Sequence, residues 1–208
     1  MKRCVIIGAA PVSGELLRQF SGRTGDYLIC ADGGYASARE AGLVPDLLVG
    51  DFDSLCNAAP EVETIRAAVE KDDTDMLLAL KEGLRRGYEE FVLLGSLGGR
   101  LDHTAANIQA VAWGLQHGVF VLLADENNLV TMLQNDSARI PRLEGYHLSL
   151  FSYTGRCRGV TVRGVKYPLE GACLDQYFPL GVSNEIEAAE AFVQVDEGIL
   201  LIVMSREG

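Results

Sequence analysis

The chain has 208 residues, a length that suits one large domain or two small ones. Its composition, 48% hydrophobic and 23% charged, is ordinary for a soluble globular protein that buries a core. The formal net charge of −11 argues against non-specific binding of DNA or RNA, which needs a basic surface, but leaves a nucleotide ligand open where metal ions neutralise its phosphates.

The cysteines and the apolar runs indicate a cytoplasmic protein. Five cysteines are scattered along the chain without a C-x-x-C pair, and an odd count without metal-like spacing favours reduced thiols. The apolar run near the N-terminus is too short for a signal peptide, and no later window reaches membrane-spanning length. We therefore expect neither a leader nor a membrane anchor.

Up to about residue 135, short apolar runs alternate with stretches of helical periodicity. The pattern predicts strands at residues 4–8, 27–32, 46–51, 90–95 and 119–125, and helices at residues 14–22, 35–42, 75–87 and 103–118. Apolar runs that alternate with helices imply parallel strands covered on both faces. We therefore expect an α/β fold for this part of the chain.

After about residue 140 the pattern changes to strand-like runs separated by turns that contain glycine. Residues 193–203 predict a hairpin that turns at residues 196–198, and residues 184–192 are the one stretch here with helical character. We infer a second, mostly β domain of roughly 65 to 70 residues.

Polar clusters occur immediately after the predicted strands of the first domain. Three of them follow a strand and a fourth immediately precedes a helix; they lie at residues 32–34, 51–54, 96–103 and 71–75. In an open parallel sheet, ligands bind in the crevice beyond the carboxyl ends of the strands. We therefore expect the four clusters to line one crevice.

Asp51 and Asp53 point to the same face if the chain is extended there. Two carboxylates about 4 Å apart at an effective dielectric constant of about 20 repel each other by roughly 4 kcal/mol, which a proton, an arginine or a metal ion must offset. Six aspartates fall in the four clusters, namely Asp32, Asp51, Asp53, Asp72, Asp75 and Asp102. Such a concentration of hard oxygen ligands suits Mg²⁺, so Asp51 and Asp53 are predicted to share a metal ion.

The glycine-rich stretch SLGGR, residues 96–100, is suited to bind phosphate groups beside such a metal site. Its backbone amides and the guanidinium of Arg100 match phosphate oxygens. Acids for a metal beside glycines and arginine for phosphate are typical of phosphoryl-group chemistry. The chain has neither a P-loop nor a G-x-G-x-x-G motif.

Each of these features also has a purely structural interpretation, and so do two polar stretches of the second domain. Asp72 or Thr74 can cap a helix, and Arg100 can simply pair with Asp102. The glycines can serve tight turns, the residues around Tyr167 can form a packed turn beside Pro168, and Ser183-Asn184 can cap the helix suggested at residues 184–192.

Five stretches in order, at residues 31–55, 71–80, 94–103, 164–171 and 181–185, resemble the thiamine pyrophosphokinase family. The resemblance implies a Rossmann-like parallel-sheet domain at residues 1–138 that binds the nucleotide and a smaller β-sandwich domain at residues 139–208 that binds thiamine. It also implies a homodimer with active sites at the subunit interface. The implied reaction moves pyrophosphate from ATP to the hydroxyl group of thiamine and requires Mg²⁺, giving thiamine diphosphate and AMP.

The same resemblance assigns roles to individual residues. It makes Asp51, Asp53 and Asp75 the metal ligands. Together with Asp72, Arg100 and Asp102 they form the catalytic set. It places around the nucleotide Asp32, Gly33, Gly34, Ser54, Thr74, Ser96, Gly98, Gly99, Arg100 and His103. It places around thiamine Tyr167, Ser183, Asn184 and Asp102. Leu97 departs from the family pattern, which more often has a small or hydroxyl residue there, and the loop at residues 8–14 has no definite role.

Two other classes of protein share parts of this pattern. A D-x-D motif after an apolar run also occurs in haloacid-dehalogenase-like phosphatases, although there it follows the first strand and here it follows the third. A module that binds Mg-ATP without turnover would use the same acids and glycines. Release of AMP that depends on thiamine separates the kinase from both.

Overall fold

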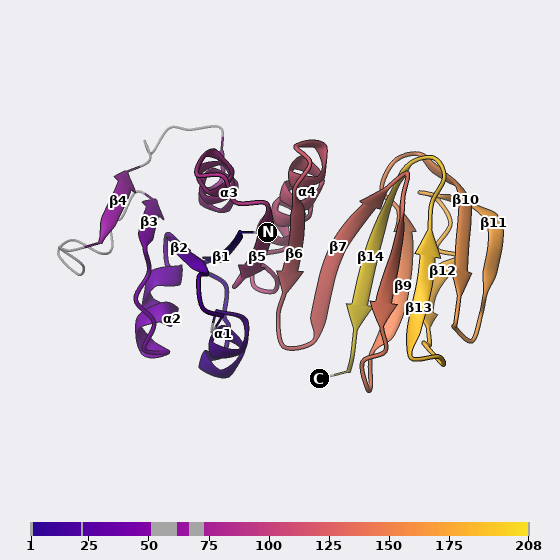
Figure 1. Cartoon of the computed structure of the whole chain (residues 1–208), viewed down its shortest axis with the longest axis horizontal. Coiled ribbons are helices and arrows are strands. Elements are labelled where there is room, and N and C mark those ends of the chain that lie inside the picture. The colour runs from indigo at the N-terminus through magenta and orange to yellow at the C-terminus, as the bar shows by residue number, and fades with distance from the viewer. Residues whose placement is uncertain (1, 22, 51–61, 67–72, 208) are drawn as a thin grey trace. The chain divides into compact units, whose positions relative to one another are not determined.

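The structure is a computed structural model that describes residues 2–21, 23–50, 62–66 and 73–207. The chain divides into two compact units, Met1–Glu126 and Asn127–Gly208, which Figure 1 shows in indigo to rose and in orange to yellow. The division lies before the predicted boundary at residues 138 and 139. The strands β7 (Asn128–Gln134) and β8 (Ser137–Pro141) both pair with strands of the second unit.

The described residues of the first unit form a parallel sheet in the order β4-β3-β2-β1-β5-β6. These strands are β1 (Arg3–Ile7), β2 (Tyr27–Ala31), β3 (Leu47–Gly50), β4 (Glu63–Arg66), β5 (Glu90–Leu94) and β6 (Phe120–Ala124). All five residues of β1 are buried, as expected for the centre of a parallel sheet with both faces covered.

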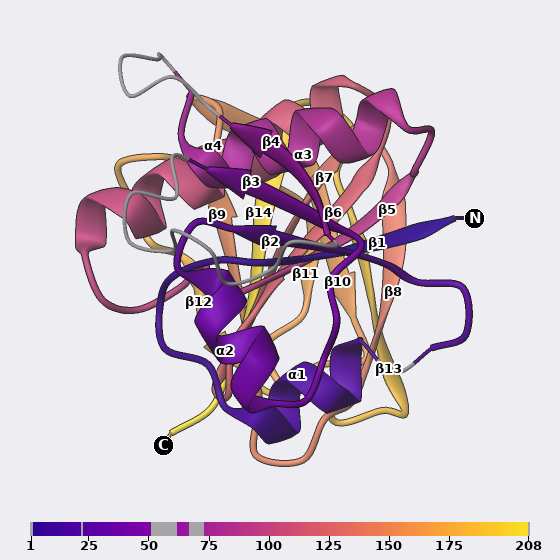
Figure 2. The ribbon, with the colours of Figure 1, turned by 90° about the vertical axis from the view of Figure 1, so that its left-hand side faces the viewer.

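Helices cover both faces of this sheet. The helices α1 (Gly14–Phe20) and α2 (Gly34–Glu40) lie on one face, and α3 (Asp75–Arg85) and α4 (Leu101–Gln116) lie on the other (Figures 1 and 2). The predicted α/β character of this part of the chain is therefore confirmed. Among the described residues, no helix has both the length and the apolar content that crossing a bilayer demands.

The strand order reverses beside β1. From β1 the chain continues to β2 on one side of it, and β5 lies on its other side. In open α/β sheets, ligands bind at such a reversal, beyond the carboxyl ends of the strands. The ends of β1 and β5 are therefore the place to look for a site.

The second unit consists of antiparallel strands in the described residues. One set has the order β12-β9-β14-β7 and the other β11-β10-β13-β8. The strands not yet given are β9 (His147–Ser152), β10 (Arg156–Arg163), β11 (Leu169–Asp175), β12 (Gly181–Asn184), β13 (Glu190–Gln194) and β14 (Ile199–Ser205). One buried cluster draws side chains from both sets, including Leu148, Val162 and Leu200.

Two predictions for the second unit are wrong. Residues 184–192 are not helical, because Ala191, Val193 and Val195 are buried in alternation, the period of a strand rather than of a helix. Residues 193–203 are not a hairpin either. The strand β13 pairs with β8 and β10, whereas β14 pairs with β7 and β9, so the turn joins strands of different sets.

Candidate active site

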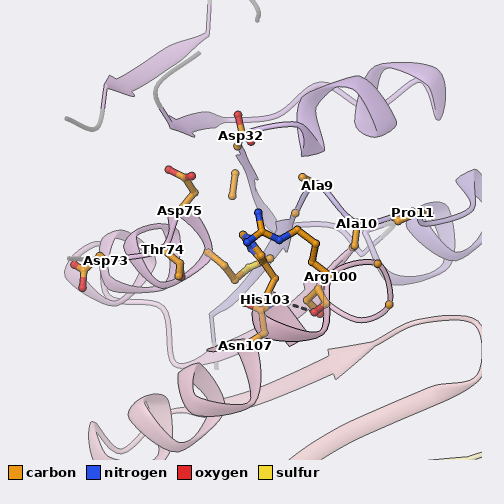
Figure 3. A pocket seen from close by; sticks show the side chains of 17 residues that line it. Ala9, Ala10, Pro11, Asp32, Asp73, Thr74, Asp75, Arg100, His103 and Asn107 are labelled. Carbon is orange, nitrogen blue, oxygen red and sulfur yellow. Dashed lines mark hydrogen bonds between the residues drawn. The ribbon is translucent and has the colours of Figure 1, made fainter. Parts of the chain in front are cut away.

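A pocket of about 500 Å³ lies where the ends of β1, β2 and β5 meet the starts of α3 and α4. Figure 3 shows Asp32, Asp75, Arg100 and His103 around the same space. The full lining consists of Gly8, Ala9, Ala10, Pro11, Ala31, Asp32, Asp73, Thr74, Asp75, Met76, Gly95, Ser96, Gly98, Gly99, Arg100, His103 and Asn107. The structure therefore brings three of the four predicted clusters together, at the predicted edge of the sheet.

Two glycines allow the loops after β1 and β5 to approach each other. A Cβ atom on Gly8 would lie 2.6 Å from the carbonyl oxygen of Gly95, and one on Gly95 would lie 2.5 Å from the carbonyl oxygen of Gly8. The amide of Ala10 then donates to the Gly95 carbonyl at 3.0 Å. This approach places residues 8–11 on the pocket wall, although no definite role was predicted for the loop at residues 8–14.

Asp32 ends β2 in a left-handed conformation, with a φ angle of +47°. A non-glycine residue rarely adopts this conformation, and such residues cluster at functional sites. The amide of Asp32 donates to the Val49 carbonyl of β3 at 2.9 Å, which fixes the residue at the pocket edge. Gly33 is the N-cap residue of α2 and Gly34 its first residue, and neither lines the pocket. Gly34 instead packs against the backbone of β1.

The start of α3 contributes the second acidic group. Thr74 is the N-cap residue, and its hydroxyl oxygen accepts a hydrogen bond from the amide of Leu77 at 3.2 Å. The capping interpretation is thus confirmed for Thr74, which also lines the pocket. Asp75 follows as the first helical residue. Asp73 precedes the helix and forms an ion pair with Lys81 of α3, whose ammonium lies 2.6 Å from its carboxylate, so its charge is already balanced.

Hydrogen bonds from buried side chains hold the glycine-rich loop after β5 in place. The Ser96 hydroxyl donates to the Leu93 carbonyl at 2.9 Å, so it is engaged by the end of β5. Asn107 of α4 is buried and donates from its side-chain amide to the Ser96 carbonyl at 2.6 Å. Gly98 and Gly99 have φ angles of +76° and +65°, a conformation that favours glycine. The loop is therefore fixed against α4 while its glycines face the pocket.

Arg100 precedes the first residue of α4, where it is the N-cap residue without a capping side-chain bond. Its guanidinium donates to both carboxylate oxygens of Asp102, at 3.1 Å and 2.5 Å. This pairing holds the pKa of Asp102 below its usual range, and the amide of His103, donating at 3.0 Å, acts in the same direction. The pairing interpretation is confirmed, and it leaves Arg100 and His103 on the pocket wall. Asp102 is not a lining residue.

Four predicted residues, Asp51, Asp53, Ser54 and Asp72, lie outside the described residues. Gly50, the last described residue before the first three, lies against Asp32, since a Cβ atom on Gly50 would be 3.2 Å from the Asp32 Cα atom. Among the described residues, no three histidine, cysteine, aspartate or glutamate side chains gather closely enough to hold a metal ion. The metal ligands therefore remain a prediction.

Three of the four predicted thiamine residues lie together in the second unit, whereas Asp102 belongs to α4 of the first unit. Tyr167 is in the connection between β10 and β11 with 61% of its surface exposed, and Asn184 ends β12 and contacts the backbone of Tyr167. Ser183 has a φ angle of +58°, and its amide donates to the Ser149 hydroxyl at 3.0 Å. The capping interpretation of Ser183-Asn184 is wrong, because no helix follows them.

Sequence patterns of one family match both units. The pattern described as "Thiamin pyrophosphokinase, catalytic domain" matches residues 22–123, and that described as "Thiamin pyrophosphokinase, vitamin B1 binding domain" matches residues 135–200. Together the two matched stretches cover most of the chain.

Individual relatives agree with this result. The chain is 28% identical to thiamine pyrophosphokinase of Bacillus subtilis (strain 168) over 218 residues, which covers 100% of both chains. It is 26% identical to thiamine pyrophosphokinase 1 of Oryza sativa subsp. japonica over 180 residues, which covers 78% of this chain and 67% of the relative.

Solved structures show the same similarity. The crystal structure of thiamine pyrophosphokinase from Bacillus subtilis matches with a TM-score of 0.91 at 26% identity, over 100% of both chains. A family protein from Enterococcus faecalis matches with a TM-score of 0.83 at 28% identity, over 99% of this chain and 100% of the other. The chain belongs to the thiamine pyrophosphokinase family, whose members make thiamine diphosphate from thiamine.

Proposed function

We propose that this protein transfers the pyrophosphate group of ATP to the hydroxyl group of thiamine in a reaction that requires Mg²⁺. The observation that carries the proposal is the pocket at the strand-order reversal, where Asp32, Asp75 and Arg100 meet although they are far apart in the sequence. In the reaction the thiamine hydroxyl oxygen bonds to the β-phosphorus, and the bond from that phosphorus to the oxygen bridging the α- and β-phosphates breaks. The products are thiamine diphosphate and AMP, and the hydroxyl proton is released.

The phosphates of ATP are proposed to lie against the loop at residues 96–100 and the start of α4. Backbone amides at a helix start and the positive end of the helix dipole favour anions, and α4 is long enough, at 16 residues, to have a full dipole. The guanidinium of Arg100 adds a charge that can bond phosphate oxygens in pairs. These groups are in place before the reaction, so they can stabilise charge that develops on the β-phosphoryl group.

The metal site is proposed to comprise Asp75 with Asp51 and Asp53. Carboxylate oxygens are the ligands that Mg²⁺ prefers, and Asp75 lines the pocket that would hold the phosphates. Asp73 is a poorer candidate because Lys81 already neutralises it. When bound, Mg²⁺ would neutralise phosphate charge and so reduce the repulsion between ATP and the aspartates.

Asp102 is proposed to orient Arg100 rather than to accept the proton of thiamine. A general base works best when its pKa lies near the working pH, whereas the pKa of Asp102 is held below its usual range by Arg100. Asp72, the other aspartate of the predicted catalytic set without a proposed metal role, is then our candidate for the base.

Thiamine is proposed to bind in the second unit, against the ring of Tyr167. Thiamine has a permanent positive charge on its thiazolium ring, and the face of an aromatic ring attracts a cation by about 0.5 to 2 kcal/mol. Tyr167 is exposed and available for such a contact, and Ser183 lies beside Asn184, the residue that holds Tyr167.

By the family resemblance we further propose a Rossmann-like first domain, a β-sandwich second domain and a homodimer with active sites at the subunit interface. The thiols of Cys4, Cys30, Cys157 and Cys173 are free, in keeping with the proposed cytoplasmic location.

Product analysis tests the proposed reaction directly. The protein is incubated with thiamine, ATP and Mg²⁺, and the products are separated by chromatography. We expect thiamine diphosphate and AMP in equal amounts, and neither without Mg²⁺. Release of ADP or phosphate that does not depend on thiamine would contradict the proposal and favour a phosphatase.

A further inference from the structure

We propose that Asn184 is a positioning residue for thiamine binding, which acts by holding Tyr167 and not by contacting thiamine. The inference rests on the proposed function, in which the ring of Tyr167 receives the thiazolium cation. It adds to that function by distinguishing Tyr167, which is proposed to bind thiamine, from Asn184, which is proposed to orient Tyr167.

The side-chain amide of Asn184 bonds both backbone groups of Tyr167. Its Oδ1 atom accepts from the Tyr167 amide at 3.0 Å, and its Nδ2 atom donates to the Tyr167 carbonyl at 2.8 Å. A carboxamide has the same donor and acceptor as a peptide group, so Asn184 acts on Tyr167 as a neighbouring strand would.

This contact continues a short antiparallel ladder. Val165 and Ile186 form a β-bridge, and the amide of Lys166 donates to the Glu185 carbonyl at 2.9 Å. The ammonium of Lys166 also lies 2.8 Å from the Glu185 carboxylate. Asn184 thus extends the pairing by one residue, to the residue that carries the aromatic ring.

Tyr167 depends on its backbone for its orientation because its side chain is mostly exposed, at 61%. Pro168 follows it and restricts its backbone to extended conformations. The Lys166 ammonium lies 5.7 Å from the centre of the ring. Since little packing holds the ring, the two hydrogen bonds from Asn184 are what fix the direction of its Cα–Cβ bond.

The bonding capacity of Asn184 argues against its binding the thiazolium cation directly. An amide oxygen can accept two hydrogen bonds, and Oδ1 already accepts from the amides of Tyr167 and Glu185, each at 3.0 Å. The oxygen is the part of the amide that would attract a cation. What remains is one N–H donor, which a thiazolium ring does not attract.

A double-mutant cycle tests the inference with the full-length protein. Thiamine KM is measured at saturating Mg-ATP for wild type, Asn184→Ala, Tyr167→Ala and the double variant, and thiamine affinity is measured by calorimetry. We expect Tyr167→Ala to raise KM about 3- to 30-fold. Asn184→Ala should raise it about fivefold, mostly in KM rather than kcat, because the ring remains but is no longer held. In the Tyr167→Ala background the Asn184→Ala change should alter KM less than twofold.

Asn184→Asp provides a second discrimination and preserves the size of the side chain. It would set a carboxylate oxygen against the Tyr167 carbonyl, so under our proposal thiamine KM rises at least as much as in Asn184→Ala. If Asn184 contacted thiamine instead, Asn184→Asp would change KM as much in the Tyr167→Ala background as in the wild-type background. Because this variant removes no volume, it also keeps the test valid if Asn184→Ala fails to fold.

The possible outcomes separate this inference from the proposed function. Equal effects of Asn184→Ala with and without the Tyr167 ring would overturn the inference while the proposed role of Tyr167 stands. An unchanged KM in Tyr167→Ala would overturn the role of Tyr167 and the inference with it. Absence of thiamine turnover by the wild-type protein would instead reject the proposed reaction.

Discussion

Arg100 and Asp102 form an exposed ion pair at the start of α4, with side-chain exposures of 74% and 64%. Such pairs add little to stability in water. The pair is therefore better understood as a means of orienting Arg100 toward the pocket. Its electrostatic consequence is a pKa of Asp102 below the usual range, caused first by the side-chain hydrogen bond from Arg100.

Removal of the guanidinium should reverse this shift. In Arg100→Ala we expect the pKa of Asp102 to rise toward that of an ordinary aspartate, as measured by NMR titration of its carboxyl carbon. The sign follows from the lowered folded-state pKa. The contribution of Asp102 to stability is present above the unfolded-state pKa, about 3.9, and is lost as the pH falls through the folded-state pKa.

Arg39→Ala is a matched control because Arg39 is an exposed helical arginine of the same unit. It should leave the pKa of Asp102 where the wild type has it. An unchanged Asp102 pKa in Arg100→Ala would show that the pairing is not the cause.

Single residues also show why part of the site escaped prediction. Asn107 supports the Ser96 carbonyl from within α4, and Asp73 is balanced by Lys81. Nothing in the sequence separates Asn107 and Asp73 from other polar residues in or beside helices, since their roles come from partners 11 and 8 residues away. Asp32, Asp75 and Arg100 were predictable because each follows or precedes an apolar element at the same edge of the sheet.

At the scale of elements, the contact between α2 and β1 sets the pocket edge. Gly34, the first residue of α2, lies so close to β1 that a Cβ atom would be 2.0 Å from the carbonyl oxygen of Ile7. Backbone atoms in a central strand cannot move aside cheaply. This explains the second glycine of the Asp32-Gly33-Gly34 cluster by packing rather than by ligand contact.

Gly34→Ala should therefore destabilise the protein by about 3 kcal/mol, even though alanine favours helices. Urea denaturation measures the loss. Gly14→Ala is the matched control, since Gly14 begins α1 and its nearest neighbour is the flexible end of Arg18 at 3.2 Å. The control should stay within about 0.5 kcal/mol of wild type. Equal midpoints for the two variants would disprove the close packing of α2 on β1.

Strands that are continuous apolar runs were predictable from the sequence, and the edge strand β4 was not. The strands β1, β2, β3, β5 and β6 are runs of apolar residues. The strand β4 reads Glu-Thr-Ile-Arg and has one partly buried apolar residue, so no periodicity marks it. In the second unit, the run of glutamates and alanines at residues 185–190 favours a helix by propensity, but tertiary packing of Ala191 and Val193 overrides it.

At the scale of the whole molecule, the proposed reaction requires a negatively charged protein to bind a negatively charged nucleotide. A net charge of −11 opposes ATP unless local charges reverse the potential. Arg100, the start of α4 and a metal ion held by aspartates are the groups proposed to do this. The sequence predicted these groups, and the meeting of Asp32, Asp75 and Arg100 in one pocket is what the fold adds.

The central claim is that Asp75 helps to hold Mg²⁺ in the same pocket that binds the phosphates. Calorimetry of a non-hydrolysable ATP analogue, with and without Mg²⁺, tests it most directly. For wild type and for the exposed-residue control Glu40→Gln, Mg²⁺ should tighten binding by at least about tenfold. In Asp75→Asn most of that gain should disappear, whereas the same Mg²⁺ dependence in Asp75→Asn as in wild type would contradict the account.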